Sequence, residues 1–340
     1  MPDPAPVSFP AASVIVVGSY VQDHVWQTDR FPQPGETRRA LGFSTGPGGK
    51  GFNQAIACLR QGGEVVFVGA TGNDAIGANA RALALDEGLA CTWLVLDRVP
   101  TATAGIVVDA AGANQIMVNL AANENLSVDF LHAQSRQFSV ARVLLVQLEN
   151  NLDAVHAALE IGVAHDLLCV LNPAPMHAAL DLELLSKCDV VTPNETEFAQ
   201  LIARVSGEPL DGATLSAMGD GELHALCRML GVATVVVTLG ASGCFVSHHA
   251  DLQRGDVEQY YRIAAEKVDA IDTTGAGDSF SGALVAMLAR TEVPSFRECV
   301  SHANRVAAMS TERIGAAVAI PHLDEVIARF GARDKLPDQA

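Results

Sequence analysis

Short runs of apolar, often β-branched residues recur along the chain, and each run ends in glycine or polar residues. They lie at residues 14–18, 65–70, 143–148, 167–171, 190–191 and 234–238. Runs of this kind, which are apolar at most positions, are typical of strands that are buried on both faces of a sheet. Segments with helical periodicity separate most of them, at residues 75–87, 153–164, 180–188 and 223–230. This alternation predicts an α/β fold in which helices flank a central, mostly parallel sheet.

Two further segments have a different pattern, with polar and apolar residues in alternation. They are residues 24–45 and residues 101–120. Such alternation is typical of strands that expose one face to water. We therefore expect a small sheet that stands off the main body as a lid. Residues 13–332 are expected to form one domain, between a disordered tail (1–12) and a frayed tail (333–340).

Polar residues follow several of the buried runs. Asp23 comes shortly after the first run and Glu149 directly after the run at 143–148, while TPNETE (192–197) and LGASG (239–243) follow later ones. The carboxyl ends of parallel strands meet at one edge of a sheet and form a ligand-binding crevice there. These residues are therefore expected to line one site.

The motif DTTGAGDSF at residues 272–280 precedes an apolar, helix-like run at 281–289, and a β-like segment with Val268 and Ile271 leads into it. The free N–H groups of Gly275, Ala276 and Gly277 at a helix start would form an anion site together with the helix dipole. Asp278 beside a bound phosphate could take a proton from an attacking hydroxyl. The alternative is a glycine turn in which Asp278 only caps the helix.

A second glycine-rich segment, GPGGKGFNQ (46–54), leads into a predicted helix at 55–61. Its glycines fit the spacing of a dinucleotide-binding fingerprint, but the segment follows a half-polar strand and not the first buried one. It is not a P-loop either, because glycine follows Lys50 where serine or threonine is required. What remains is a glycine-rich helix start that carries Lys50, a possible phosphate or hydroxyl donor, and Asn53, whose amide can bind two hydroxyls.

The composition narrows the class of protein. The 340 residues are 49% hydrophobic and carry a net charge of −17. This charge argues against nucleic acid as a partner. Seven scattered cysteines without a C-x-x-C pair favour free thiols in a reducing cytosol. No apolar run is long enough for a transmembrane helix, and residues 1–12 do not have the pattern of a signal peptide. We therefore expect a cytoplasmic protein.

The motifs together resemble those of the PfkB-type carbohydrate kinases, and within that family the ribokinases most closely. GGKGFNQ (48–54) resembles the family's N-terminal signature and DTTGAGD (272–278) its C-terminal one, with NPAP (172–175), TPNETE and TLGASG (238–243) between them in the family's order. The resemblance covers about residues 14–330. It implies a ribokinase-like sheet flanked by helices, with a β-sheet lid that also forms a dimer interface.

The resemblance also implies roles for individual residues. Asp278 would be the base, and Gly275, Ala276 and Gly277 the anion hole for the phosphoryl group of ATP. Sugar hydroxyls would be bound by Asp23, Gly49, Lys50, Asn53 and Glu149. Asn194 and Glu197 would organise Mg²⁺ and the phosphates, while Thr238, Gly240, Gly243 and Asn304 would contact the nucleotide. Asp272, Thr274, Ser310 and Gly315 would belong to a loop that binds a monovalent cation such as K⁺.

Two residues depart from the pattern usual in ribokinases. Val21 stands where they have asparagine, and Phe52 where they have a small residue. D-Ribose, phosphorylated at its primary hydroxyl, is still the first choice. A lost hydrogen bond and an added ring would also suit a nucleoside, fructose or 2-keto-3-deoxygluconate. A third interpretation is a non-catalytic sugar sensor, against which the presence of Asp278 argues.

Overall fold

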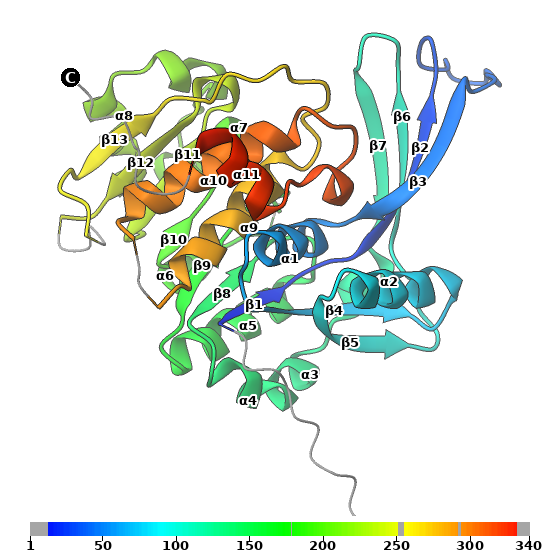
Figure 1. Cartoon of the computed structure of the whole chain (residues 1–340), viewed down its shortest axis with the longest axis horizontal. Helices are drawn as coiled ribbons and strands as arrows, with labels where there is room; N and C mark the ends of the chain where they lie inside the picture. Colours follow the sequence, from blue (N-terminus) through cyan, green and yellow to red (C-terminus); the bar gives the residue numbers. More distant parts are fainter. Residues whose placement is uncertain (1–12, 178, 251–254, 292–293, 332–340) are drawn as a thin grey trace, which may run out of the picture.

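In the computed structural model of the chain, two separate β-sheets are formed, one of nine strands and one of four. The structure describes residues 13–177, 179–250, 255–291 and 294–331. The two predicted tails, 1–12 and 333–340, lie outside these ranges. The expected α/β architecture with a small second sheet is confirmed (Figure 1).

The strands are short, as their apolar runs predict. In the main sheet, in spatial order, they are β13 (Tyr260–Ile263), β12 (Cys244–His248), β11 (Thr234–Thr238), β10 (Val190–Val191), β9 (Leu168–Leu171), β8 (Val143–Val146), β1 (Val14–Val17), β4 (Val65–Gly72) and β5 (Ala90–Leu96). All neighbours pair in parallel except β11–β12 and β12–β13. The order runs outward in both directions from β1 and β8, so the connectivity changes direction between these two strands. In open α/β sheets this is where ligands bind.

Helices cover both faces of the main sheet. The α-helices are α1 (Lys50–Arg60), α2 (Ala75–Asp86), α3 (Val128–Ala133), α4 (Ser135–Phe138), α5 (Leu152–Ala164), α6 (Leu182–Ser186), α7 (Glu195–Ser206), α8 (Asp220–Met229), α9 (Ala276–Leu288), α10 (Phe296–Ser310) and α11 (Leu323–Phe330). Single 3₁₀ turns lie at Ala121–Asn125, Gly212–Ala217, Gly240–Ser242 and Ala317–Ala319. No helix in the described ranges combines the length and the apolar character that crossing a bilayer requires.

The central strand β1 shows why these runs are apolar at every position. Ile15 and Val17 pack into the core on the face covered by α5, α7 and α8. Val14 and Val16 pack into the core on the opposite face, under α1, α9 and α10. Successive strand residues point to opposite faces, so a strand with helices on both sides has no position left for a polar residue.

The second sheet has the order β3 (Gly42–Gly48), β2 (Val21–Gln27), β6 (Thr103–Val108) and β7 (Asn114–Asn119). Its strands stand away from the main sheet at the upper right of Figure 1. One face, with Val21, Ala102 and Ala104, forms a small apolar cluster of its own. The prediction of a separate sheet from residues 24–45 and 101–120 is thus confirmed, and its first strand begins at Val21.

Two local expectations were wrong, and one pair of strands was missed. Helix α1 begins at Lys50 and not at residue 55, so Lys50 and Asn53 lie within its first turn. No strand leads directly into the 272–280 motif, because the preceding strand, β13, ends at Ile263. Ile271 is 67% exposed, and its N–H donates to the carbonyl of Thr311. The antiparallel edge strands β12 and β13 were not predicted.

Candidate active site

The sequence motifs meet where the sheet changes direction. The carboxyl ends of β1 and β8 lead to Ser19 and Glu149, and helices α1 and α9 both begin above them. A helix N-terminus carries free N–H groups and a partial positive charge, so two of them at one crevice favour an anionic ligand.

Glycines allow α1 to begin directly on the end of β1. A Cβ on Gly51 would lie 2.5 Å from the Cα of Gly18, and a Cβ on Gly18 would lie 2.6 Å from the Cα of Gly51. Gly49, just before the helix, has a φ of 90°, a conformation that other residues rarely adopt. The glycines of this motif therefore serve the close approach of helix and strand.

A second close approach brings α9 against α1. A Cβ on Gly282 would lie 2.2 Å from the carbonyl oxygen of Gln54, so only glycine fits there. Asp278 is four residues before Gly282 and therefore on the same face of α9. The packing that requires glycine at 282 thus directs Asp278 toward the first turn of α1.

Asp278 is 6% exposed, and both of its carboxylate oxygens accept hydrogen bonds from α1. The side-chain amide of Asn53 donates to Oδ2 and that of Gln54 to Oδ1, both at 2.9 Å. The Oδ1 atom of Asn53 is buried and has no hydrogen-bond partner within the described residues. A buried acceptor of this kind needs a donor, and the hydroxyl of a bound ligand would supply one.

Glu149 connects the ends of the two strands to α1. Its Oε2 accepts from the hydroxyl of Ser19 at 2.5 Å and from the backbone N–H of Lys50 at 2.8 Å. The carboxylate therefore caps the first turn of α1 while its other oxygen remains available to a ligand.

Charged groups surround this crevice. Burial, followed by the neighbouring charges of Glu149 and Asp278, raises the pKa of Asp23 to about 7. Burial alone would lower the pKa of Lys50, but Asp278, Glu149 and Glu197 outweigh it and raise the pKa. Lys50 is thus a cation held among three carboxylates, and it is half-buried instead of pointing freely into solvent.

The predicted anion site lies at the start of α9. Gly275 is the N-cap residue with a φ of 75°, and Gly277 is exposed, with nothing near the position of a Cβ. The N–H of Ala276 donates to the carbonyl of Thr273 at 3.2 Å, so it is already engaged in a turn. Among the described residues no acceptor is recorded for the N–H of Gly277.

Asn194 and Glu197 form a capping box at the start of α7. The Asn194 side chain accepts from the N–H of Glu197, and the Glu197 side chain accepts from the N–H of Asn194. Burial raises the pKa of Glu197 against the opposing effects of the Asn194 N–H and Lys50. Asn194 also forms a β-bridge with Thr238, which brings the loops after β10 and β11 together.

The remaining predicted nucleotide residues lie near β11 and α10. Gly240 and Gly243 both have positive φ, and a Cβ on Gly243 would lie 2.0 Å from the carbonyl oxygen of Ile263. Asn304, on α10, is buried and donates to the carbonyl of Ala264. Gly243 and Asn304 thus both contact residues 263–265 at the end of β13, the first through close packing of the backbone and the second through a hydrogen bond.

Asp272 connects two loops beside the anion site. Its Oδ1 accepts from the N–H of Thr274 at 2.9 Å and its Oδ2 from the N–H of Gly315 at 2.8 Å. These hydrogen bonds outweigh burial, which acts in the opposite direction, and lower the pKa of Asp272. Ser310 is buried and its hydroxyl bonds to the carbonyl of Ala307 within α10.

Phe52 does not reach the acceptor side of the crevice. Its side chain is fully buried and contacts the rings of Tyr20 and Phe67, at centroid distances of 5.2 and 5.8 Å. Val21 is also buried, in the apolar cluster of the small sheet. The expectation that Phe52 adds a ring to the acceptor site is therefore wrong, because Phe52 lies about 100° around the axis of α1 from Asn53, on the side that faces the core.

Sequence reasoning missed several polar residues of the crevice. Gln54, Gln147 and Asn172 are all buried and joined by side-chain hydrogen bonds next to Asp278. The available signal was their position, since Gln147 lies inside an apolar run and Asn172 directly follows one. A buried amide at such a position needs a hydrogen-bond partner.

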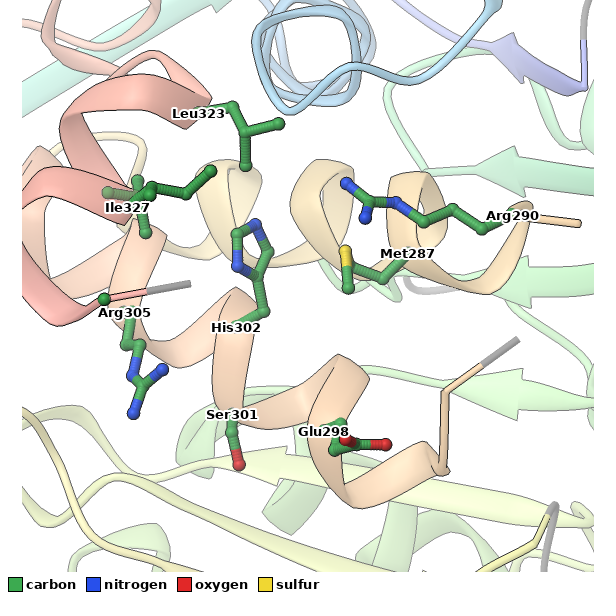
Figure 2. Close-up of a pocket in the computed structure, with 10 residues that line it drawn as sticks. Met287, Arg290, Glu298, Ser301, His302, Arg305, Leu323 and Ile327 are labelled. Carbon is green, nitrogen blue, oxygen red and sulfur yellow. The ribbon is translucent and has the colours of Figure 1, made fainter. Parts of the chain in front are cut away.

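A hollow of about 210 Å³ lies elsewhere, between α9, α10 and α11 (Figure 2). It is lined by Met287, Val326 and Ile327 and by the polar residues Arg290 and His302. None of the predicted site residues lines it.

The chain matches the family model described as pfkB family carbohydrate kinase over residues 11–323. It is 34% identical over 316 residues to a protein named ribokinase from Haemophilus influenzae, covering 93% of this chain and 97% of that one. Proteins named deoxyribokinase, from Salmonella typhi among others, are 31% identical over 275 residues.

Solved structures give the same result for the fold. The ribokinase of Giardia lamblia superposes with a TM-score of 0.83 at 28% identity, covering 94% of this chain and all of the other. The Arabidopsis thaliana ribokinase complexed with ribose and ATP gives a TM-score of 0.79 at 28% identity, covering 94% and 98%.

Proposed function

Because the chain belongs to the pfkB family of carbohydrate kinases, it is an ATP-dependent sugar kinase, and we propose that it phosphorylates the primary hydroxyl of D-ribose. The observation that carries this proposal is the environment of Asp278. A buried carboxylate at the start of α9 lies beside an unpartnered acceptor on Asn53, so one group can take a proton where the other binds a hydroxyl.

In the proposed reaction, Asp278 acts as the general base. Oδ2 takes the proton of the sugar hydroxyl, the hydroxyl oxygen forms a bond to the γ-phosphorus, and the bond between that phosphorus and ADP breaks. The N-terminus of α9, with Gly275, Ala276 and Gly277, stabilises the negative charge on the transferring group. For the N–H of Ala276 to take part, its hydrogen bond to the carbonyl of Thr273 must break.

The remaining hydroxyls of the sugar are bound on the other side of Asp278. Asp23 and Glu149 offer carboxylate oxygens, Asn53 offers Oδ1, and Lys50 offers a charged donor. Gly49 completes the set with its backbone groups, which its φ of 90° holds in place directly before α1. A site built from such groups discriminates strongly against acceptors that leave them unpaired.

ATP is assigned to the loops after β10 and β11. Thr238, Gly240, Gly243 and Asn304 would surround the nucleoside part, and Asn194 and Glu197 would lie toward the phosphates. Mg²⁺ fits here because Glu197 is a half-buried carboxylate with one oxygen not used by the capping box. When bound, this ion neutralises charge on the phosphates.

A monovalent cation is assigned to the loops that Asp272 connects. An ionised carboxylate and the carbonyls around Thr274, Ser310 and Gly315 are the hard oxygen ligands that K⁺ prefers. The cation would stabilise the loop that carries Gly275.

The small sheet is assigned two roles, as a mobile lid over the acceptor and as the interface of a homodimer. Alternation along β2 directs Asp23 to the face toward the crevice, and His24 and Trp26 to the opposite face. There, His24, Trp26 and Phe43 form a ring cluster, and Met117 is 82% exposed. Exposed aromatic residues on a sheet face are typical of an interface.

The scattered cysteines support a cytoplasmic location.

The acceptor is tested by coupled measurement of ADP release with ribose, deoxyribose, fructose, 2-keto-3-deoxygluconate and nucleosides. We expect the highest kcat/KM with ribose. The burial of Phe52 removes one argument for a nucleoside, and the deoxyribokinase relatives make deoxyribose the most relevant competitor. A kcat/KM for ribose more than ~100-fold below that of another acceptor would reassign the substrate, because a hydroxyl-matched site should reject poorer fits by at least that factor.

A further inference from the structure

Four side chains form a continuous chain of hydrogen bonds that ends on Asp278. Gln147 Nε2 donates to Gln54 Oε1 at 2.5 Å, and Gln54 Nε2 donates both to Asp278 Oδ1 at 2.9 Å and to Asn172 Oδ1 at 3.1 Å. Asn172 Nδ2 in turn donates to the backbone carbonyl of Thr192 at 2.8 Å. All four side chains are buried.

The direction of every bond in this chain is determined by its ends. The carbonyl of Thr192 can only accept, so the amide nitrogen of Asn172 must face it and the Asn172 oxygen must face Gln54. Gln54 then meets two acceptors, Asn172 Oδ1 and the Asp278 carboxylate, and must present its nitrogen to both. Its oxygen is left for Gln147, which has to donate. A reversed Gln54 would place oxygen against oxygen at two buried contacts.

From this geometry we infer that Gln54 is a positioning residue, which fixes the Asp278 carboxylate through Oδ1 and thereby presents Oδ2 to the acceptor hydroxyl. The inference rests on the proposed role of Asp278 as base. The two donors to Asp278 differ in what else they can do. Asn53 has a free acceptor, Oδ1, that can bind a hydroxyl of the sugar, whereas Gln54 has all of its polar atoms engaged.

The fixed bond matters because of the geometry of the proton transfer. A base must lie within hydrogen-bond reach of the proton it takes, and small displacements of a reacting group lower the rate steeply. With Oδ1 held by Gln54, rotation of the carboxylate about its Cβ–Cγ bond is restricted. Loss of this bond should therefore lower kcat while leaving the binding of both substrates largely intact.

The test compares Gln54→Met with Gln61→Met. Both glutamines belong to α1 or its C-cap, both are fully buried, and Gln61 donates to the carbonyl of Pro321 and bonds to His302, far from Asp278. Each variant removes one buried amide. We expect similar losses in unfolding temperature, a fall in kcat of ~10- to 100-fold only for Gln54→Met, and unchanged KM for ATP and sugar in both. Equal kcat losses, or none for Gln54→Met, would overturn the inference.

A second variant covers the case in which Gln54→Met does not fold. Gln54→Glu keeps the shape and the acceptor for Gln147, but it places a carboxylate against Oδ1 of Asp278, and two facing carboxylates must share a proton. We expect a lower kcat with a pH profile that differs from that of the wild type, and an unchanged profile would refute the positioning role. Asp278→Asn is assayed in parallel. If it retains turnover, the proposed base is wrong, whereas an inactive Asp278→Asn beside fully active Gln54 variants refutes only the inference about Gln54.

Discussion

Asn53 Nδ2 donates to Asp278 Oδ2 at 2.9 Å across a sequence separation of 225 residues. The first residue belongs to the glycine-rich N-terminal motif and the second to the C-terminal one, and the bond joins the starts of α1 and α9. Each helix start is a partial positive charge. The two motifs are therefore in direct contact, and in the proposed mechanism this contact brings the hydroxyl-binding group next to the proton-accepting one.

The first prediction concerns the base itself. Asp278→Asn should lower kcat by ~10²–10⁴-fold, the usual cost of removing a positioned general base, and should leave ATP binding in place. Steady-state rates and calorimetric titration with a nonhydrolysable ATP analogue measure the two properties. Asp153→Asn is the matched control, because Asp153 also lies in the first turn of a helix but is exposed. Near-normal turnover of Asp278→Asn would exclude it as the base.

The second prediction concerns pH and Asp23. In the folded protein its pKa is raised to about 7, whereas in an unfolded chain it is ~3.9. Between pH ~4 and 7, Asp23 is protonated in the folded state and ionised in the unfolded state. The stabilisation that Asp23 contributes to the folded state is therefore complete below pH ~4 and is lost as the pH rises through 7. Asp23→Asn resembles the protonated form. It should therefore raise the unfolding temperature at pH 8 and change it little at pH 4.

Differential scanning fluorimetry of both proteins at the two pH values measures this difference. Other groups titrate in the same range, but they are common to both proteins and cancel in the comparison. An equal shift at both pH values would show that the pKa of Asp23 is not raised by its surroundings.

The sequence predicts the inner part of the fold well. Strands such as β1 and β8 are apolar at every position because helices cover both faces, and this pattern is local. Edge strands are different. Tyr260–Ile263 and Cys244–His248 pair antiparallel beyond β11, and their polar and aromatic residues have no regular period, so they were not predicted. The apolar Val268 and Ile271 suggested a strand, but β13 already forms the edge of the sheet.

For the candidate site, the sequence indicated the residues with distinctive chemistry. It did not indicate the residues whose part in the site depends on their hydrogen bonds to other site residues. Asp278, Lys50 and Asn53 are recognisable because glycines surround them. Gln54 and Gln147 are not, because only the packing of α1 against α9 shows that the Gln54 amide donates to Asp278, and Gln147 is connected to Asp278 only through Gln54. Phe52 was wrongly expected at the acceptor site, since a residue next to a binding residue on a helix points about 100° away from it.

The third prediction follows from the position of Phe52. Phe52→Ala should destabilise the protein by about 3–5 kcal/mol, because it leaves a cavity among Tyr20, Phe67 and the α1 core. It should not change the order of acceptors by kcat/KM. Urea unfolding and the acceptor panel measure the two effects. A selective gain for nucleosides would show that Phe52 limits the size of the acceptor after all.

The fourth prediction concerns the outer face of the small sheet. Trp26→Ser together with Phe43→Ser should convert the proposed dimer into monomers, because these rings pair across β2 and β3 and are partly exposed. Light scattering at micromolar concentration measures the mass. Leu85→Ser, which removes an even more exposed apolar side chain on α2, should leave the mass unchanged. A wild-type protein that is monomeric under these conditions would contradict the interface.

The fifth prediction concerns the loop that Asp272 holds. Its carboxylate bonds to Thr274, directly before the N-cap of α9, and to Gly315 in the loop after α10. A cation in this loop would add positive potential near Gly275, and a unit charge at ~8 Å with an effective dielectric constant of ~20 contributes about 2 kcal/mol. Turnover should therefore be at least ~10-fold higher in KCl than in tetramethylammonium chloride at equal ionic strength.

Asp272→Ala should remove this difference by lowering the rate in KCl to the level found in the organic cation. Asp269→Ala is the matched control, because Asp269 lies three residues earlier in the same segment, is exposed, and is held only through its backbone N–H to Glu312 within the described residues. It should keep the response to K⁺. The comparison separates a cation site from a loop that is merely ordered by Asp272, since a purely structural role would lower the rates in both salts by the same factor.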